Sequence, residues 1–503
     1  MSNAESTRPG FLDRRRIIAH PGFSRWLVPP AALSIHLAIG EVYAFSVFKL
    51  PLTQVLGVTG PASGDWTQPD VAWVFSIAIV FLGLSAALFG SWLERVGPRK
   101  AMFASAACFG GGFLVSAVGV WWHQIWLVYL GYGVLGGIGL GLGYISPVST
   151  LIKWFPDRPG MATGLAIMGF GGGAMIGSPL SQFLMDCFRS PTSTGVAETF
   201  TVLGVLYFGF MLFGVITVRL PPPGWRPRGW EKHHTSAPST GGLTPNEAMR
   251  TPQFWLLWAV LLLNVTAGIG VLEQASPMIQ EMFPDRVTAT AAAGFVGLLS
   301  LFNMLGRFAW SSISDRIGRK PTYMIFFALG AVLYALTPQT GAIGSVVLFV
   351  VSYAVIMSMY GGGFATIPAY LRDQFGTARV GAIHGRLLTA WSLAGIAGPV
   401  LVNNIRQYQI DHGVAKADAY TVTMYLMAGL LVVGFVCNLL VRRPDPIRLS
   451  VNNAPGPEPA VFVEEHPPGE TRWQTLAFRW SWVGIPLGLG VWKTVDTSLA
   501  LFR

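Results

Sequence analysis

The sequence predicts an all-α polytopic membrane protein with two similar six-helix halves, twelve membrane-spanning helices in all, followed by one additional helix. Three observations support this fold class: an apolar composition, a series of long apolar runs, and a motif that occurs twice at a fixed offset. Of the 503 residues, 52% are hydrophobic and 12% are charged, and the mean hydropathy is +0.51. A soluble multidomain protein is less apolar than this.

Apolar runs of about 20 residues are long enough to cross a ~30 Å hydrocarbon core as helices. We expect twelve spans that begin near Trp26, Val71, Ala101, Gln124, Met161, Thr199, Phe254, Thr290, Thr322, Ile343, Val380 and Tyr420, and a thirteenth near Trp480. Each helix satisfies its own backbone hydrogen bonds, as the membrane interior requires.

A repeated motif indicates that the twelve helices form two halves. "GSWLERVGPRK" stands between the second and third spans, and "SSISDRIGRK" stands 221 residues later between the eighth and ninth. Glu94 thereby pairs with Asp315 and Gly97 with Gly318, the relation expected for internally repeated transporters. We expect, in order, an N-terminus at 1–25, a first half at 26–220, a linker at 221–253, a second half at 254–443, a Pro-rich tether at 444–479 and the added helix at 480–502.

Positive charges are distributed unequally between the two sides of this topology. Of 34 Lys and Arg residues, 23 fall at the N-terminus, in the loops after even-numbered spans and at the exit of the twelfth, against five in the opposite loops. Positive residues concentrate on the cytoplasmic side, so both ends of the twelve-helix body should be cytoplasmic. The net charge of +10 then reflects topology rather than nucleic-acid binding, and we expect a bacterial inner membrane.

The sequence offers no signal for an enzyme, a cofactor or a metal. Cys108, Cys187 and Cys437 are far apart and have no neighbouring histidine cluster, which argues against zinc and disulfides. Gly131, Gly133 and Gly136 satisfy G-x-G-x-x-G, but they lie inside a membrane span instead of between a strand and a helix. There they favour close helix packing.

The repeated loop resembles the hallmark of the major facilitator superfamily, an acidic-Arg-x-Gly-x-Arg/Lys turn after the second helix that is often echoed after the eighth. The resemblance covers roughly residues 20 to 443 and implies function as a monomer. A carboxylate at a helix end can pair with arginines or with the positive end of another helix, so we expect a cytoplasmic gate formed by Glu94, Arg95, Arg99, Asp315, Arg316 and Arg319. Alternatively, these are solvated, positively charged loops.

A narrower resemblance connects the chain with the oxalate/formate antiporter family. The segments that carry it are "KWFPDRPGMATGLAIMGFGGG", "MRTPQFWLLW", "YGGGFATIP" and "DQFGTARVGAIHG". This resemblance implies that Arg307, in the eighth helix, binds the carboxylate of a small organic anion, the fitting partner for a planar guanidinium. Arg307 lies about 12 Å inside the membrane face, at 1.5 Å per residue from Asp315, while the equivalent position in the first half is Ala86. The alternative is an arginine that snorkels back to the headgroups.

The same resemblance implies an aromatic lining around Arg307. The matching positions are Tyr43, Tyr144, Tyr360 and Phe364, with His36 at a further lining position; each could equally serve packing or anchor a helix at the interface. The oxalate carrier has a lysine in helix 11 where this chain has Trp391. With one positive charge, a monocarboxylate such as formate, lactate or pyruvate fits better than a dianion.

Proton coupling would need an acid within the membrane. In the monocarboxylate porters of the same superfamily, an aspartate precedes the helix 8 arginine by four residues, and here that position is Asn303. Glu41, in "AIGEVYAF" in the middle of the first span, is the candidate, because burial raises the pKa of a carboxyl group. It could equally be a structural partner of a polar group on another helix.

These observations predict a secondary transporter of a small carboxylate that works by alternating access, as an antiporter or a proton symporter, with a counter-anion or proton as the coupled ion. One alternative is an exporter of drugs or other amphipathic compounds, and another is a receptor that senses a carboxylate without moving it. The thirteenth segment resembles small single-span subunits that accompany some members of the family. We expect it to cross the membrane on the rim of the carrier; a hairpin on the inner leaflet is the alternative.

Overall fold

The computed structural model describes residues 10–20, 22–223, 225–227, 242–442 and 473–499. Within these ranges the chain forms helices and loops without a β-strand. The expected N-terminus at 1–25, the linker at 221–253 and the tether at 444–479 lie partly outside the described residues.

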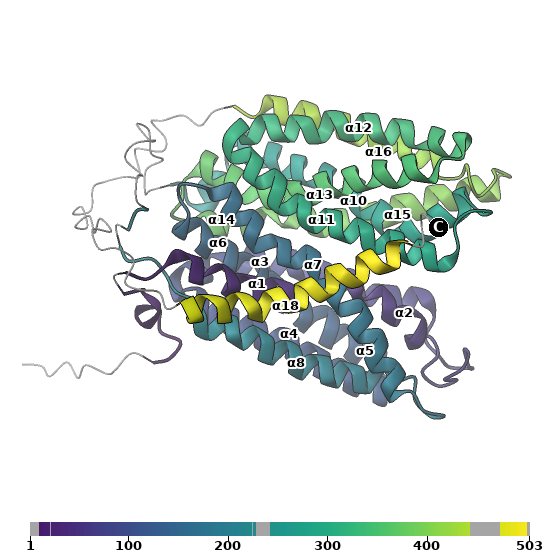
Figure 1. Ribbon diagram of the computed structural model, residues 1–503, viewed down its shortest axis with the longest axis horizontal. Helices are drawn as coiled ribbons and strands as arrows, with labels where there is room; N and C mark the ends of the chain where they lie inside the picture. Colours follow the sequence, from purple (N-terminus) through teal and green to yellow (C-terminus); the bar gives the residue numbers. More distant parts are fainter. Residues whose placement is uncertain (1–9, 21, 224, 228–241, 443–472, 500–503) are drawn as a thin grey trace, which may run out of the picture.

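The N-terminal half contains the first six spans and is coloured purple to teal in Figure 1. The 3-10 helices η1 (Arg14–Ile17) and η2 (Arg25–Leu27) precede them. The spans are built from α1 (Pro29–Ile39), the 3-10 helix η3 (Gly40–Ala44), α2 (Ser46–Leu52), α3 (Gln68–Val96), α4 (Pro98–Trp121), α5 (Ile125–Val128), the π-helix η4 (Tyr129–Gly136), α6 (Gly137–Trp154), α7 (Pro159–Phe188) and α8 (Val196–Thr217).

The C-terminal half, green in Figure 1, lies beside the first and contains the next six spans. It begins with a short helix, α9 (Pro245–Met249). The spans are α10 (Pro252–Met282), α11 (Ala289–Ile317), α12 (Arg319–Ile343), α13 (Val346–Phe375), the pair α14 (Val380–Leu387) and α15 (Thr389–Asp411), and α16 (Thr421–Leu440). The final helix, α18 (Trp473–Ser498), begins seven residues before the start expected at 480.

Eleven segments in the described part of the chain are long and apolar enough to cross a membrane. They account for eleven of the twelve expected spans, and α11 and α18 fall outside this group. In its last four turns α11 carries Asn303, Arg307, three serines and Asp315. A helix of this composition is stable in a membrane where neighbouring helices cover its polar side chains, and Arg307 is fully buried.

The two repeated loops share a backbone conformation that explains their glycines. Gly97, between α3 and α4, has φ of +86°, and Gly318, between α11 and α12, has φ of +93°. A side chain is strained at such φ values. Each glycine therefore permits the sharp turn between two antiparallel spans, and the turn sets Glu94 and Asp315 at the ends of their helices.

Three spans are interrupted near the middle of the bundle. The first changes to a 3-10 helix at Gly40–Ala44, the fourth to a π-helix at Tyr129–Gly136, and the eleventh divides at Leu388. Interruptions of this kind often accompany functional sites in membrane transporters. Glu41 and Tyr43 lie in the 3-10 segment and Tyr132 in the π-helix. Trp391 lies in the first turn of α15.

Glycines bring the two halves into close contact at one end of the bundle, the end that carries Arg14, Arg95, Lys153 and Arg316 and is called the basic face below. A Cβ at Gly385 of α14 would overlap the main-chain oxygen of Ala86 on α3. A Cβ at Gly164 of α7 would lie 2.6 Å from the main-chain oxygen of Arg307 on α11. Small residues permit such approach between membrane helices, and here they close the bundle on its basic face.

Helix α18 packs along the junction between the two halves (Figure 1, yellow). Near its start, Arg479 donates a hydrogen bond to the main-chain oxygen of Leu27, and Trp482 stacks on Phe210 of α8 at 5.6 Å. Near its end, Thr494 approaches Gly297 of α11. The thirteenth helix therefore contacts both halves.

Candidate functional site

Arg307 lies at the centre of the bundle and is completely buried. Its Nε donates to Asn303 Oδ1 at 2.9 Å, and its Nη1 donates to the main-chain oxygen of Ile167 on α7 at 3.3 Å. Its Nη2 has no hydrogen-bond partner, and none of the ion pairs found among the described residues includes Arg307. The guanidinium therefore has no ion-pair partner among the described residues and one free donor in the interior.

The direction of this side chain excludes snorkelling. A residue that snorkels to the basic face would extend past Asp315, toward the C-terminal end of α11. Arg307 instead reaches back one turn to Asn303, toward the N-terminal end of its helix, which is the usual direction for a helical side chain. It points into the bundle and away from the nearer membrane face.

Six aromatic side chains surround Arg307, and we call them the aromatic cage: Tyr43, Tyr144, Phe170, Tyr360, Phe364 and Trp391. The guanidinium lies over two of the rings, 5.6 Å from the centroid of Phe170 and 5.3 Å from that of Phe364. Both rings also contact Trp391, at 5.3 and 4.5 Å. Cation–π contacts offset part of the cost of burying the charge, so the cage supports a cation in the absence of a carboxylate.

The remaining members of the cage connect to the same rings. Tyr43 of the first span and Tyr144 of α6 contact Phe170 at 5.1 and 5.5 Å, and Tyr360 contacts Phe364 at 5.3 Å. Tyr144 also contacts Trp391 at 5.2 Å. The structure thus brings together all four tyrosine and phenylalanine positions expected from the sequence and Trp391, drawn from both halves.

The cage carries an unusual concentration of polar atoms without partners. The hydroxyl of Tyr144 and the indole Nε1 of Trp391 are buried without a hydrogen-bond partner in the described part of the chain. The buried hydroxyls of Tyr43 and Tyr360 lie next to each other without good hydrogen-bond geometry. Tyr43 lies close to both Arg307 and Tyr360. Leaving a buried donor unpaired costs about 1–3 kcal/mol. Several such atoms around one buried cation are what a polar, anionic ligand would satisfy.

His36 lies at the edge of the cage, with its ring 5.4 Å from that of Tyr144. Its Nδ1 is 3.2 Å from the main-chain oxygen of Ala32, and its Nε2 has no described partner. In the neutral tautomer that donates from Nδ1 to this carbonyl oxygen, Nε2 is an acceptor. His36 therefore adds an acceptor to a site that otherwise consists of donors.

Sequence reasoning missed two residues of this site. Phe170 of α7, in the glycine-rich "GFGGG" segment, touches Arg307 and three members of the cage. His384 of α14 is buried, lies 5.8 Å from Tyr144, and has no described partner for either ring nitrogen. A single phenylalanine among glycines is the signal that could have indicated Phe170; His384 has no such signal.

Glu41 does not belong to the aromatic cage. It is buried within the N-terminal half, where its Oε2 accepts a 3.3 Å hydrogen bond from Tyr132 of the π-helix and its Oε1 has no described partner. On the other side it lies against Gly177 of α7, whose Cβ would be 3.0 Å from Glu41 Cγ. Glu41 is thus an acid in an almost entirely apolar setting, beside the cage rather than facing Arg307.

On the basic face, Asp315 connects the two halves. Its carboxylate accepts hydrogen bonds from the main-chain nitrogens of Gly160 and Met161, at 2.9 and 2.8 Å, and pairs with Arg319 at 2.6 Å. The first N–H groups of a helix have no partner within it. An acid of the C-terminal half therefore completes the N-terminus of α7, which belongs to the other half.

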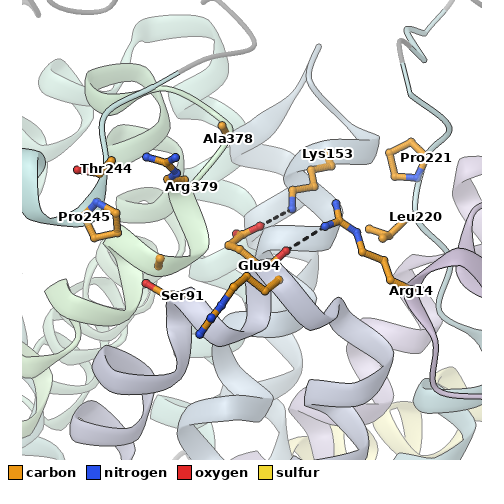
Figure 2. Close-up of a pocket in the computed structure, with 12 residues that line it drawn as sticks. Arg14, Ser91, Glu94, Lys153, Leu220, Pro221, Thr244, Pro245, Ala378 and Arg379 are labelled. Carbon is orange, nitrogen blue, oxygen red and sulfur yellow. Dashed lines mark hydrogen bonds and ion pairs between the residues drawn. The ribbon is translucent and has the colours of Figure 1, made fainter. Parts of the chain in front are cut away.

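Glu94, the counterpart of Asp315, sits at the second junction on this face (Figure 2). It pairs with Lys153 at 2.8 Å, and Arg14 donates to its main-chain oxygen at 3.1 Å. Its other carboxylate oxygen is directed at α14, where a Cβ at Gly381 would lie 2.7 Å from it. These residues line a hollow of about 710 Å³ that also includes Arg379 of the C-terminal half.

The other three expected gate residues occupy different settings. Arg95 and Arg316 are exposed on the basic face. Arg99 is buried inside the N-terminal half, where Nε donates to the main-chain oxygen of Val215 at 3.0 Å and Nη2 to that of Ile216 at 3.1 Å. Arg99 therefore holds the end of α8 and does not reach the junction between the halves.

A cavity opens between the two halves on the face opposite the basic face. A cavity of about 250 Å³ lies between the halves there, lined by Val42, Tyr43, Phe75, Leu272, Ser276 and Val296 among others. Tyr43 belongs to both this cavity and the aromatic cage. The cavity therefore borders the aromatic cage on this side, through Tyr43.

The comparisons with known proteins agree with this architecture. A sequence model of the Major Facilitator Superfamily matches residues 23–399. The chain is 28% identical over 381 residues to the oxalate:formate antiporter of Oxalobacter formigenes, covering 75% of this chain and 83% of the antiporter. It is 24% identical over 396 residues to the apicoplast pyruvate carrier 1 of Toxoplasma gondii, covering 67% and 70% of the two chains.

A third relative, the aspyridones efflux protein of Emericella nidulans, is 22% identical over 423 residues, which cover 82% of this chain and 78% of that protein. Among solved structures, the E. coli fucose:proton symporter FucP superimposes with a TM-score of 0.61 at 12% identity, covering 84% of this chain and all of FucP. The likeness to FucP concerns the fold.

Proposed function

The chain belongs to the major facilitator superfamily, whose members are transporters rather than enzymes, and we propose that it carries a small monocarboxylate such as formate, lactate or pyruvate by alternating access. The observation that carries this proposal is the fully buried guanidinium of Arg307, which has an unpaired Nη2 and no described carboxylate partner. A planar guanidinium binds a carboxylate through two parallel hydrogen bonds. The hydroxyls of the cage supply further donors to the same anion.

The choice of a monocarboxylate follows from charge balance. Arg307 is the one cationic side chain in the cage, and the position at which the resembling oxalate carrier has a lysine is the neutral Trp391. In a site of low dielectric constant, a second negative charge would remain uncompensated. Two relatives, named an oxalate:formate antiporter and a pyruvate carrier, support a small carboxylate as the substrate class.

The charge distribution orients the protein. The basic face, with the N-terminus and the repeated loops, belongs in the cytoplasm, and the 250 Å³ cavity then opens outward. We place the protein in a bacterial inner membrane, working as a monomer. Energy comes from a counter-anion gradient in an antiporter or from protons in a symporter, with Glu41 as the proton-binding acid.

Asp315 and Glu94 form the cytoplasmic gate in this proposal. Each acid lies beside the start of a helix from the opposite half, α7 for Asp315 and α14 for Glu94. An anionic side chain at a helix N-terminus is stabilised by the unpaired N–H groups and the helix dipole. Both contacts must break when the halves rock to expose the site to the cytoplasm.

Two other functions fit less well. An exporter of amphipathic cations would need an acidic cavity, whereas the cage carries a positive charge; the similarity to an efflux protein keeps neutral or anionic compounds as a second candidate class. A receptor would bind a carboxylate without moving it. Flux through purified protein in liposomes separates the receptor from the transporter.

Replacing Arg307 tests the proposed substrate site. We expect Arg307→Ala to lower the uptake efficiency for labelled formate, lactate or pyruvate by roughly 100-fold, because two charge-assisted hydrogen bonds are worth about 1.5 kcal/mol each at the least. Arg307→Lys keeps the charge but loses the planar fork of the guanidinium. Its uptake efficiency should lie between those of the wild type and Arg307→Ala. The measurement is initial uptake into proteoliposomes.

The matched control is Arg15→Ala, which removes an exposed arginine of the N-terminal segment and should leave uptake unchanged. Each variant must elute from size-exclusion chromatography as the wild type does. Normal uptake by a correctly folded Arg307→Ala protein would rule out the carboxylate clamp, and saturable binding without uptake in the wild type would favour the receptor.

Glu41→Gln tests proton coupling. If Glu41 carries the proton, the variant loses uptake driven by an inward proton gradient but retains exchange of labelled for unlabelled substrate at equal pH, because exchange requires no net proton movement. Tyr132→Phe, which removes the one described hydrogen bond to this carboxyl group, should keep both activities. Equal loss of uptake and exchange in Glu41→Gln would show a structural role.

Asp315→Asn tests the gate. The reporter is a cysteine at position 163, because Thr163 donates a hydrogen bond across the halves to the main-chain oxygen of Ala365 at 2.6 Å. An impermeant maleimide added from the cytoplasmic side labels this cysteine when the gate opens. In Asp315→Asn the labelling rate should rise by about tenfold or more, the value of one charge-assisted hydrogen bond. Asp373→Asn is the control, since Asp373 pairs with Arg319 inside one half. Equal labelling rates in the two variants would contradict the gate.

A further inference from the structure

Trp391 carries a buried hydrogen-bond donor without a partner, at a position distinct from Arg307. The side chain is fully buried near the start of α15, and its Nε1 has no hydrogen-bond partner in the described chain. An indole N–H donates and never accepts. Its partner must therefore be a lone pair, and no described protein atom provides one.

The indole and the guanidinium share their neighbours. Phe170 and Phe364 each contact the Trp391 ring, at 5.3 and 4.5 Å, and each lies under the Arg307 guanidinium, at 5.6 and 5.3 Å. An anion held at Arg307 against these two rings is consequently next to the indole. The second donor is neutral, so it favours an uncharged oxygen over a second carboxylate.

Small carboxylates differ in whether they carry such an oxygen. Pyruvate and lactate have an oxo or hydroxy oxygen on C2, the carbon bonded to the carboxylate carbon, whereas formate, acetate and propionate have none. Building on the proposed transport of monocarboxylates, we propose that the Trp391 indole donates a hydrogen bond to the 2-oxygen and selects 2-oxo and 2-hydroxy monocarboxylates. Arg307 binds the carboxylate, and Trp391 donates to the oxygen on the adjacent carbon.

Trp391→Phe tests this selection, because it removes the N–H and preserves an aromatic ring between Phe170 and Phe364. Uptake of labelled pyruvate and lactate should lose roughly fivefold to tenfold in efficiency, the value of one hydrogen bond. Acetate and propionate should change by less than about twofold, because they make no such bond. Equal losses for all four acids would overturn the assignment.

Comparing two competing acids on the wild-type protein tests the same selection without depending on the folding of Trp391→Phe. Pyruvate should compete for uptake roughly fivefold better than propionate, which has a similar size and no 2-oxygen; equal competition overturns the selection. Failure to transport any of the four acids contradicts the proposed function itself. The two failures are thus distinguishable.

A second inference concerns α18 and rests on its contacts with both halves. On the cytoplasmic side it is fixed to the N-terminal half, where Arg479 and Trp480 donate to the main-chain oxygens of Leu27 and Trp26 at 3.0 and 3.2 Å. Midway, Gly490 lies against Met175 of α7. These contacts attach the helix to the N-terminal half at points from its start to Gly490.

The outer end of α18 rests on the other half. A Cβ at Gly294 of α11 would lie 2.8 Å from Ser498 Cα, and a Cβ at Gly297 would lie 3.8 Å from Thr494 Cβ. Between the two ends, Leu487 packs with Met304 of α11 and beside Gly172 of α7. The helix therefore crosses the α7–α11 seam on the side of the outward cavity.

Alternating access must change this seam, because the halves approach each other on the outer side when the cytoplasmic gate opens. We infer that α18 moves with the N-terminal half and that its outer end rests on α11 only while the cavity faces outward. It acts as a wedge that stabilises the outward-facing arrangement. This inference rests on the proposed alternating access.

Engineered disulfides test the wedge in the full chain with Cys108, Cys187 and Cys437 replaced by serine. Gly297→Cys with Thr494→Cys places two Cβ atoms about 3.8 Å apart, within disulfide range. Oxidation should abolish uptake, and a reducing agent should restore it. Gly490→Cys with Met175→Cys, whose Cβ atoms are 3.5 Å apart, joins α18 to the half with which it moves, and uptake should continue.

Unchanged uptake with the Gly297–Thr494 disulfide formed, as judged by mass spectrometry, would overturn the wedge. Loss of uptake with both disulfides would also contradict it, because α18 would then have to leave the N-terminal half as well. Uptake in the reduced state verifies that transport itself is intact. A failure of the wedge is therefore separate from a failure of the proposed function.

Discussion

The arrangement around the site depends on one buried positive charge that has no carboxylate partner among the described residues. Placing an isolated cation in a membrane interior costs several kcal/mol unless other groups solvate it. Asn303, the Ile167 carbonyl and the faces of Phe170 and Phe364 supply that solvation for Arg307. All four are weaker than an anion, so the site supports the charge and still favours a negative ligand.

This solvation is possible because glycines let α7 and α11 approach closely. A Cβ at Gly171 would lie 3.0 Å from Arg307 Nε, and Gly164 has a similar close approach to the backbone of α11. The Ile167 carbonyl and the Phe170 ring, one turn apart on α7, consequently reach a side chain of the opposite half. Because the guanidinium is solvated by both halves, an anion bound to it also touches both, and its binding is sensitive to their relative position.

Much of the fold and part of the site follow from the sequence. The apolar runs and the 221-residue repeat predicted the two halves. The resemblance to the oxalate/formate antiporter family indicated Arg307, and the repeat added that its counterpart, Ala86, carries no charge. Phe170 was missed because a phenylalanine in an apolar helix looks the same whether it packs in the core or lines a site. The division of the eleventh span at Leu388 and the path of α18 depend on tertiary contacts, which apolar periodicity does not report. A motif can also suggest a role that the tertiary contacts do not support. Arg99 was expected in the gate because of its place in the motif, but its hydrogen bonds lie inside one half.

Charge also bears on the transport cycle. With a monocarboxylate bound as proposed, Arg307 and the anion form a pair, and the halves rock around a neutral site. Without it, the rocking movement must carry an uncompensated charge through arrangements in which the solvating contacts from α7, in the opposite half, are disturbed, at a cost of several kcal/mol. The empty carrier then returns more slowly than the loaded one, which favours exchange of one carboxylate for another. Proton symport requires an additional group that changes charge during the cycle, and Glu41, beside the cage and shared between the first, fourth and fifth spans, is the buried acid positioned to do so.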